Sequence, residues 1–72
     1  MQANNFVKIV KDLAVSKKLD WTSFREKRMW EVGKNLENKQ IDVDQAITEM
    51  RGEFKSYEIS DSDAKAIKEK LR

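Results

Sequence analysis

Two pairs of aspartates, each spaced two residues apart, are the first candidates for chemistry in this sequence. Asp42 with Asp44, and Asp61 with Asp63, offer the oxygen ligands with which a calcium-binding loop begins. Such a loop needs a third oxygen ligand at the next alternate position, then a glycine and a distal glutamate. That position carries alanine in one case and lysine in the other. We therefore interpret these acids as first-turn residues of helices, where the helix dipole stabilises negative charge.

The sequence also lacks the residue types that most enzymes and metal sites use. It contains no histidine and no cysteine, which removes the usual soft metal ligands, the proton carrier near neutral pH and the most reactive nucleophile. No base stands at a recognisable spacing from a serine, and the two glycines are isolated rather than gathered in a phosphate-binding loop. We predict that the protein is not an enzyme and that it binds no metal or cofactor.

The stretch from Phe24 to Trp30 is the best candidate for a binding site. Within two turns of a predicted helix it places Arg25, Lys27 and Arg28 between two large aromatic residues. Arginine and tryptophan are enriched among the residues that dominate binding energy in protein interfaces. We predict that Arg25, Lys27, Arg28 and Trp30 form a partner-binding face.

Each of these side chains also has a structural interpretation. Trp30 points away from the apolar stripe of its own helix, which favours exposure. It would instead belong to the core if that helix were sandwiched between two neighbours, with both faces buried. The stems of Arg25 and Arg28 can lie along apolar surface while their guanidinium groups reach water.

A second interpretation is a small DNA- or RNA-binding regulator. Its basic surface would be Lys17, Lys18, Arg25, Lys27 and Arg28, with the first two helices read as a helix-turn-helix. Against this, the turn has no glycine, and two glutamates interrupt the basic face. The two lysines of the turn could instead balance acids near the start of the last helix. Salt separates the two functions, because nucleic-acid binding weakens steeply through counterion release.

Charge is abundant in this chain but nearly balanced. Charged residues make up 39% of the 72 residues, and the net charge is +2. Residues 1–40 carry +4 and residues 41–72 carry −2, so the N-terminal part is the better candidate for meeting an anion. No apolar run approaches the roughly 20 residues needed to cross a bilayer, and the first residues do not resemble a secretory leader. We expect no membrane insertion and a cytoplasmic location.

The elements that must position these side chains are helices, because apolar residues recur at helical spacing and no strand alternation is present. The predicted helices are Asn5–Ser16, Trp21–Glu37, Val43–Tyr57 and Asp61–Leu71. Three of the helix starts share one pattern: a hydrophobic residue, a capping residue, and an apolar residue four positions after the cap. The predicted caps are Asp20, Asp42 and Ser60.

The spacing also predicts which residues are buried. In the second helix the predicted apolar stripe is Trp21, Phe24, Val32 and Leu36. In the third it is Val43, Ala46, Ile47, Met50, Phe54 and Tyr57. Gly33 borders the stripe of the second helix, where we expect a neighbouring helix to approach closely. Gly52 projects away from its stripe and has no such explanation.

These patterns predict an all-α fold, a compact three- or four-helix bundle with short connections in which residues 1–72 form a single helical domain. The expected function is a non-enzymatic interaction module, a small regulator or inhibitor that binds a larger protein. Accessory, immunity and antitoxin-like proteins are analogous in size and composition. Self-association through an incompletely buried face is a third alternative.

Overall fold

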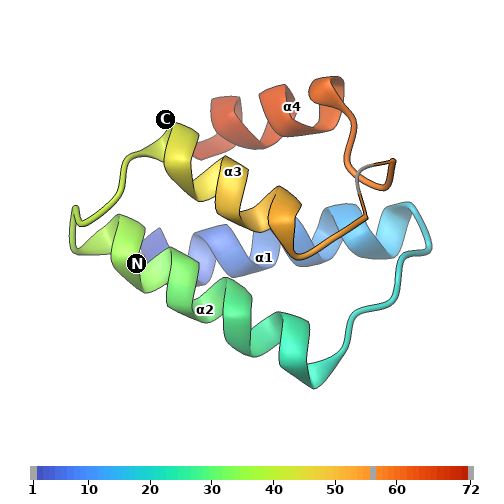
Figure 1. Ribbon diagram of the computed structural model, residues 1–72, viewed down its shortest axis with the longest axis horizontal. Helices are drawn as coiled ribbons and strands as arrows, with labels where there is room; N and C mark the ends of the chain where they lie inside the picture. The colour runs from blue at the N-terminus through green and yellow to red at the C-terminus, as the bar shows by residue number, and fades with distance from the viewer. Residues whose placement is uncertain (1, 56, 72) are drawn as a thin grey trace.

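The computed structural model describes residues 2–55 and 57–71, and these form an all-α bundle, as predicted. Its helices are α1 (Gln2–Ser16), α2 (Ser23–Glu37), α3 (Val43–Gly52) and α4 (Asp61–Leu71). Consecutive helices run in opposite directions (Figure 1). Each helix packs against two others in a ring, and the contact between α1 and α2 is the most extensive. No helix in the described part of the chain is long and apolar enough to cross a membrane.

The predicted caps of α3 and α4 are confirmed. The Asp42 carboxylate accepts a hydrogen bond from the backbone amide of Gln45 at 2.8 Å. At the start of α4 the bonds are reciprocal: Ser60 Oγ accepts from the Asp63 amide at 3.1 Å, and the Asp63 carboxylate accepts from the Ser60 amide at 3.2 Å. Asp63 therefore takes the role that glutamate usually has in a capping box.

The predicted start of α2 is wrong by two residues. Thr22, rather than Asp20, caps the helix: its hydroxyl accepts from the Arg25 amide at 3.1 Å, and α2 begins at Ser23. The connection before it stays non-helical, and Leu19 and Trp21 pack against the core from it. If α2 began at Trp21, Leu19 and Trp21 would no longer pack against the core from a non-helical connection. The packing of this connection therefore favours Thr22 over Asp20 as the cap.

Two lysines end helices in a backbone conformation that usually belongs to glycine. Lys18, after α1, has φ of 58°, and Lys39, after α2, has φ of 63°. In each case the next amide donates to the carbonyl five residues back: Leu19 to Ala14 at 2.8 Å, and the equivalent bond after Lys39 at 2.9 Å. These are Schellman motifs, which allow the chain to reverse direction directly after each helix.

The third helix is shorter than predicted, because it ends at Gly52 rather than Tyr57. The chain then leaves the helix, and Phe54 and Ile59 enter the core from the connection between α3 and α4. Tyr57, which was expected in the apolar stripe of α3, lies outside the helix and is 76% exposed. The two buried side chains close the end of the bundle, which a longer α3 would leave open.

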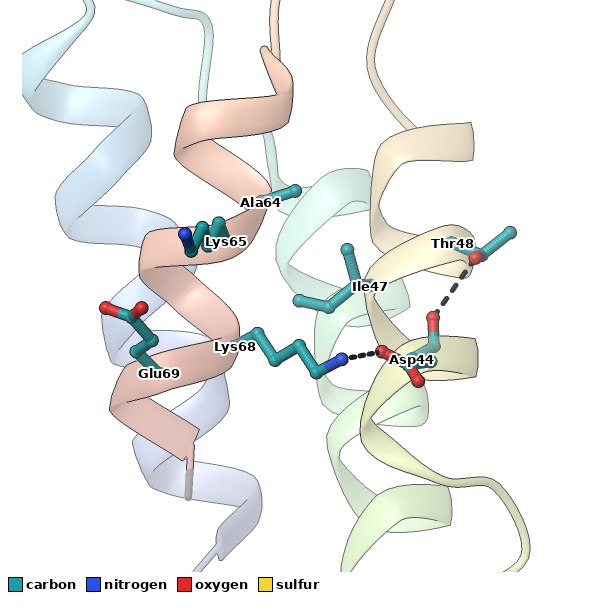
Figure 2. Close-up of a pocket in the computed structure, with 7 residues that line it drawn as sticks. All are labelled: Asp44, Ile47, Thr48, Ala64, Lys65, Lys68 and Glu69. Carbon is teal, nitrogen blue, oxygen red and sulfur yellow. Dashed lines mark hydrogen bonds and ion pairs between the residues drawn. The ribbon is translucent and has the colours of Figure 1, made fainter.

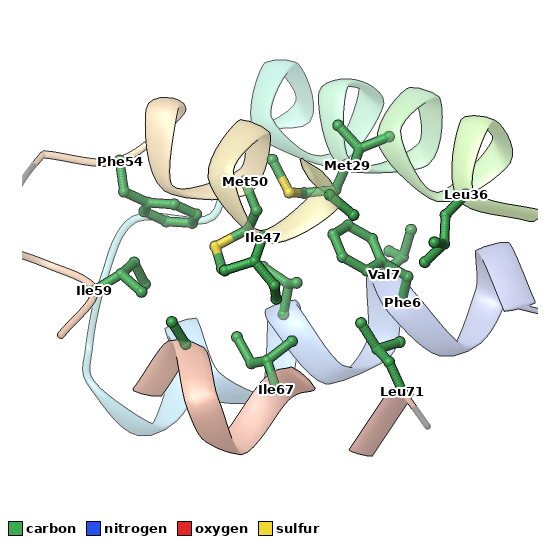
Figure 3. Packing of buried hydrophobic residues seen from close by; sticks show 14 residues of the cluster. Phe6, Val7, Met29, Leu36, Ile47, Met50, Phe54, Ile59, Ile67 and Leu71 are labelled. Carbon is green, nitrogen blue, oxygen red and sulfur yellow. The ribbon is translucent and has the colours of Figure 1, made fainter. Parts of the chain in front are cut away.

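The core draws side chains from all four helices and from the connection before α4 (Figure 3). In α2 the buried residues are Met29, Val32, Gly33 and Leu36. The prediction for Phe24 is wrong: its side chain is 68% exposed. Met29, at the edge of the predicted stripe, lies near the centre of the buried face instead, and Trp21 is only partly buried.

The close approach predicted at Gly33 is confirmed. A Cβ atom placed on Gly33 would lie 3.1 Å from both the Cα and the carbonyl oxygen of Ala3, in the first turn of α1. The missing side chain therefore lets the backbones of α1 and α2 come together at this point. Nothing lies within 4 Å of the corresponding position on Gly52, so packing does not require a glycine there.

Candidate functional site

The solvent side of α2 carries an unusual combination of exposed side chains. Phe24, Lys27, Glu31 and Lys34 follow one another at intervals of three or four residues, so they share one face of the helix, and all four are exposed. Trp30 lies within one turn of both lysines and borders this row. We call these five residues the α2 outer face. It spans about 15 Å along the helix, at a rise of roughly 1.5 Å per residue.

Arg25, predicted to contact a partner, is engaged inside the protein. Its guanidinium carbon lies 4.5 Å from the centre of the Phe54 ring, a cation–π contact. One of its nitrogens donates to the carbonyl of Asp20 at 2.6 Å, and another lies 3.6 Å from the Glu58 carboxylate. Arg25 thus fastens the connection before α4 to the start of α2.

Arg28 is engaged in the same way. It donates to the Glu53 carboxylate at 3.1 Å and to the Glu31 carboxylate at 2.6 Å. The bond to Glu53, followed by the attraction of both carboxylates, raises the pKa of Arg28 above its ordinary value. Arg28 therefore links α2 to the end of α3, and a partner would have to displace these carboxylates to reach it.

Lys27 and Trp30, the other two residues of the predicted face, have different surroundings. Lys27 is exposed and forms no ion pair with any described residue. Trp30 is partly buried and packs against the hydrophobic core. Trp30 is thus neither fully exposed nor fully buried, so neither interpretation of it from the sequence holds alone.

Lys17 and Lys18, predicted for the nucleic-acid alternative, also have structural roles. Lys17 pairs with the Asp63 carboxylate and donates to the carbonyl of Glu58, so it joins the end of α1 to the start of α4. The Lys17 hydrogen bond lowers the pKa of Asp63; burial of the carboxyl group opposes this, and the hydrogen bonds from Ser60 support it. Lys18 is exposed and ends α1 in the left-handed conformation.

The structure therefore separates the five cations of that alternative. Lys17, Arg25 and Arg28 each have a carboxylate partner within the protein, at the start of α4, in the connection before it, and at the end of α3. Lys18 and Lys27 have no such partner among the described residues and lie on different elements. The basic segment that the sequence suggests thus serves mainly to hold the α3–α4 connection in place.

The charged side chains of α2 differ in whether they have a partner within the protein. All three of its carboxylates accept hydrogen bonds: Glu26 from an indole N–H at 3.1 Å, Glu31 from an arginine at 2.6 Å, and Glu37 from a backbone amide at 3.3 Å. Lys27 and Lys34 have no ion-pair or hydrogen-bond partner among the described residues. Lys27 and Lys34 are therefore the charged side chains of α2 that have no internal partner among the described residues, and both lie on the α2 outer face beside the exposed Glu31.

The exposure of Phe24 was missed in the sequence, although a signal for it exists. Once Gly33 is taken as the contact with a neighbouring helix, Met29 and Leu36 complete the buried face around it. Phe24 precedes Leu36 by twelve residues, which at about 100° per residue places it roughly 120° around the helix. Val15, at 63%, and Tyr57, at 76%, are also exposed among the residues that the structure describes.

A groove lies between α3 and α4 (Figure 2). It has a volume of about 500 Å³ and is lined by Asp44, Ile47, Thr48, Ala64, Lys65, Lys68 and Glu69. Lys68 pairs with Asp44 across it, and Thr48 donates to the carbonyl of Asp44 at 3.1 Å. No buried side-chain nitrogen or oxygen in the described residues lacks a partner.

The two aspartate pairs, Asp42 with Asp44 and Asp61 with Asp63, do not come together in the fold. Asp42 caps α3 and Asp63 belongs to the capping box of α4, whereas Asp44 and Asp61 pair with Lys68 and Arg51 respectively. Across residues 2–55 and 57–71, no group of three or more acids is placed to hold a metal ion. Comparison with protein families, curated proteins and solved structures gives no significant match to this chain.

Proposed function

We propose that this protein is a non-enzymatic helical interaction module, a small cytoplasmic regulator or inhibitor that binds a larger protein through the α2 outer face. The observation that supports this most directly is Phe24, which is 68% exposed on the solvent side of a helix whose opposite side builds the core. Burying such a ring in a partner gains about 1.5–3 kcal/mol relative to leaving it in water. Phe24 is therefore the natural anchor.

The neighbours of Phe24 suit such an anchor. Lys27 follows one helical turn later and has no internal ion pair, so a partner can pair with it without breaking a contact of the bundle. The exposed part of Trp30 borders Lys27 and adds apolar area. Tryptophan is typical of the few interface residues that carry most of the binding energy.

The internal ion pairs of the two arginines favour protein binding over nucleic-acid binding. Arg25 and Arg28 would make the base or phosphate contacts of α2, yet both already hold carboxylates of the protein. A nucleic acid would have to compete with these contacts, whereas a protein anchored by Phe24 leaves them intact.

Affinity capture with paired variants tests this proposal. The wild type, Phe24→Ser and Val15→Ser would each be immobilised and exposed to lysate of the native host after nuclease treatment. Val15 is the matched control, because its side chain is 63% exposed on α1. We expect the wild type and Val15→Ser to retain the same protein at similar yield, and Phe24→Ser to lose most of it. Equal recovery by all three baits would rule out the α2 outer face, and loss of all retained material after nuclease would favour nucleic acid.

A further inference from the structure

We infer that the partner surface recognised by the α2 outer face is acidic: an apolar recess that receives Phe24, flanked by carboxylates that pair with Lys27 and Lys34. This inference rests on the proposed function and adds the chemistry of the partner. It follows from how α2 distributes its charges between the inside of the protein and the solvent.

The charged side chains of α2 differ in whether they have a partner within the protein. All three carboxylates of α2 accept hydrogen bonds within the protein, and its two arginines pair with carboxylates. Lys27 and Lys34 alone among its charged side chains have no partner in the described residues. Glu31 lies between these lysines, and its carboxylate pairs at 2.6 Å with Arg28, which also pairs with Glu53. The α2 outer face therefore carries two free cations and one partly compensated anion.

Phe24 and the two lysines are regularly spaced along α2. Phe24 precedes Lys27 by one helical turn, and Lys34 follows Lys27 by two turns, at a rise of about 10 Å. Two carboxylates on a partner helix, also separated by two turns, would match the lysines, with an apolar pocket one turn beyond. Such complementarity raises association rates and selects the partner more than it adds affinity.

The same lysines offer little to a nucleic acid. Affinity for nucleic acid grows with the number of phosphates that are neutralised, and complexes with strong salt dependence make about 6–10 such contacts. The α2 outer face has two free cations, and the arginines beside it are engaged. An acidic protein surface therefore fits this face better than a phosphate backbone does.

Selection from a displayed library of random 16-residue peptides tests the inference, because such a library offers the protein every combination of apolar and acidic residues. Peptides would be selected on the wild-type protein, and their affinities measured for Phe24→Ser, for Lys27→Glu/Lys34→Glu, and for Lys65→Glu/Lys70→Glu. The last variant is the matched control, because it makes the same change in net charge at two exposed lysines of α4. Circular dichroism would verify that each variant is folded.

We expect selected peptides to combine an apolar anchor with two or more acidic residues. Each exposed ion pair contributes up to about 1 kcal/mol, so loss of both pairs on charge reversal at Lys27 and Lys34 should weaken binding by up to about thirtyfold. The α4 variant should change it by less than about twofold. Binding should also weaken as salt rises.

Three outcomes would contradict us, and they are distinguishable. Peptides that depend on Phe24 but carry no acidic residues, and tolerate Lys27→Glu/Lys34→Glu, would overturn the inference and leave the proposed function standing. Peptides that bind Phe24→Ser as well as the wild type would overturn the proposed function itself. A single-stranded DNA oligonucleotide that binds more tightly than every selected peptide, and is weakened by the same charge reversal, would assign the face to nucleic acid.

Discussion

Replacing Gly33 with alanine tests the contact that sets the distance between α1 and α2. The new Cβ would lie 3.1 Å from the Cα and the carbonyl oxygen of Ala3, whereas carbon atoms prefer a separation of about 3.5–4.0 Å. Both atoms belong to backbone, so relief requires a shift of the first turn of α1 rather than the rotation of a side chain. Overpacking of this kind typically costs about 1–3 kcal/mol.

An opposing term must be subtracted from this cost. Alanine in place of glycine stabilises the interior of a helix by about 0.5–1 kcal/mol, so we expect Gly33→Ala to lower the free energy of unfolding by about 1 kcal/mol. Gly52→Ala separates the two effects, because nothing lies within 4 Å of its Cβ position. At this last residue of α3 we expect a gain of no more than about 0.5 kcal/mol.

Urea denaturation followed by circular dichroism and tryptophan fluorescence measures both variants. The slope with denaturant should stay unchanged, because neither substitution alters the surface exposed on unfolding. In thermal unfolding, a loss of 1 kcal/mol corresponds to a decrease of about 4–8 °C in Tm for a domain of this size. If Gly33→Ala proved as stable as Gly52→Ala, the approach of α1 to α2 would not be limited by Gly33, and the packing described for this pair would be wrong.

Three further predictions concern helix ends, pH and burial. Lys39→Gly should raise the free energy of unfolding by about 1 kcal/mol, because φ of 63° strains a residue with a Cβ. The control Lys8→Gly, inside α1, should lower the free energy of unfolding by a similar amount. Equal effects of the two substitutions in chemical denaturation would refute the strain at Lys39. The pKa of Asp63 is lower in the folded protein than its ordinary value of 3.8, so its stabilisation is complete above about pH 4 and is lost as pH falls through the folded pKa. Denaturation between pH 2 and 6 should therefore show the advantage of the wild type over Asp63→Asn shrinking on acidification, and a constant advantage would contradict the ion pair. Met29→Ala should lower the free energy of unfolding by about 2–5 kcal/mol because Met29 is fully buried, whereas Phe24→Ala should change it by less than about 0.5 kcal/mol. A larger loss for Phe24→Ala than for Met29→Ala would support the burial of Phe24 that the sequence predicted.

Much of the fold could be predicted from the sequence because its signals are local. The caps Asp42 and Ser60 act on amides three residues away, so the pattern that predicts them contains the whole interaction. Gly33 is similarly informative, since a glycine inside a helix costs stability and calls for a close neighbour. The prediction for Asp20 was wrong because Thr22 is also a capping residue, and the choice between them depends on the packing of the preceding connection against the core.

The candidate site was predicted less well, because each of its residues depends on a neighbour distant in sequence. Phe24 matches an apolar spacing, but the buried side of α2 is chosen by the two helices packed against it. Tyr57 continues the spacing of α3, yet the chain leaves that helix at Gly52 so that Phe54 and Ile59 can close the end of the bundle.

The sequence by itself determined that the chain forms amphipathic helices and where two of them are capped, since both follow from contacts within one or two turns. Only the tertiary structure decided which charged side chains are paired within the protein. Arg28 meets Glu53 across 25 positions of sequence, and Lys17 meets Asp63 across 46. Ion pairs of that range form only when helices pack side by side, and they leave Lys27 exposed beside Phe24.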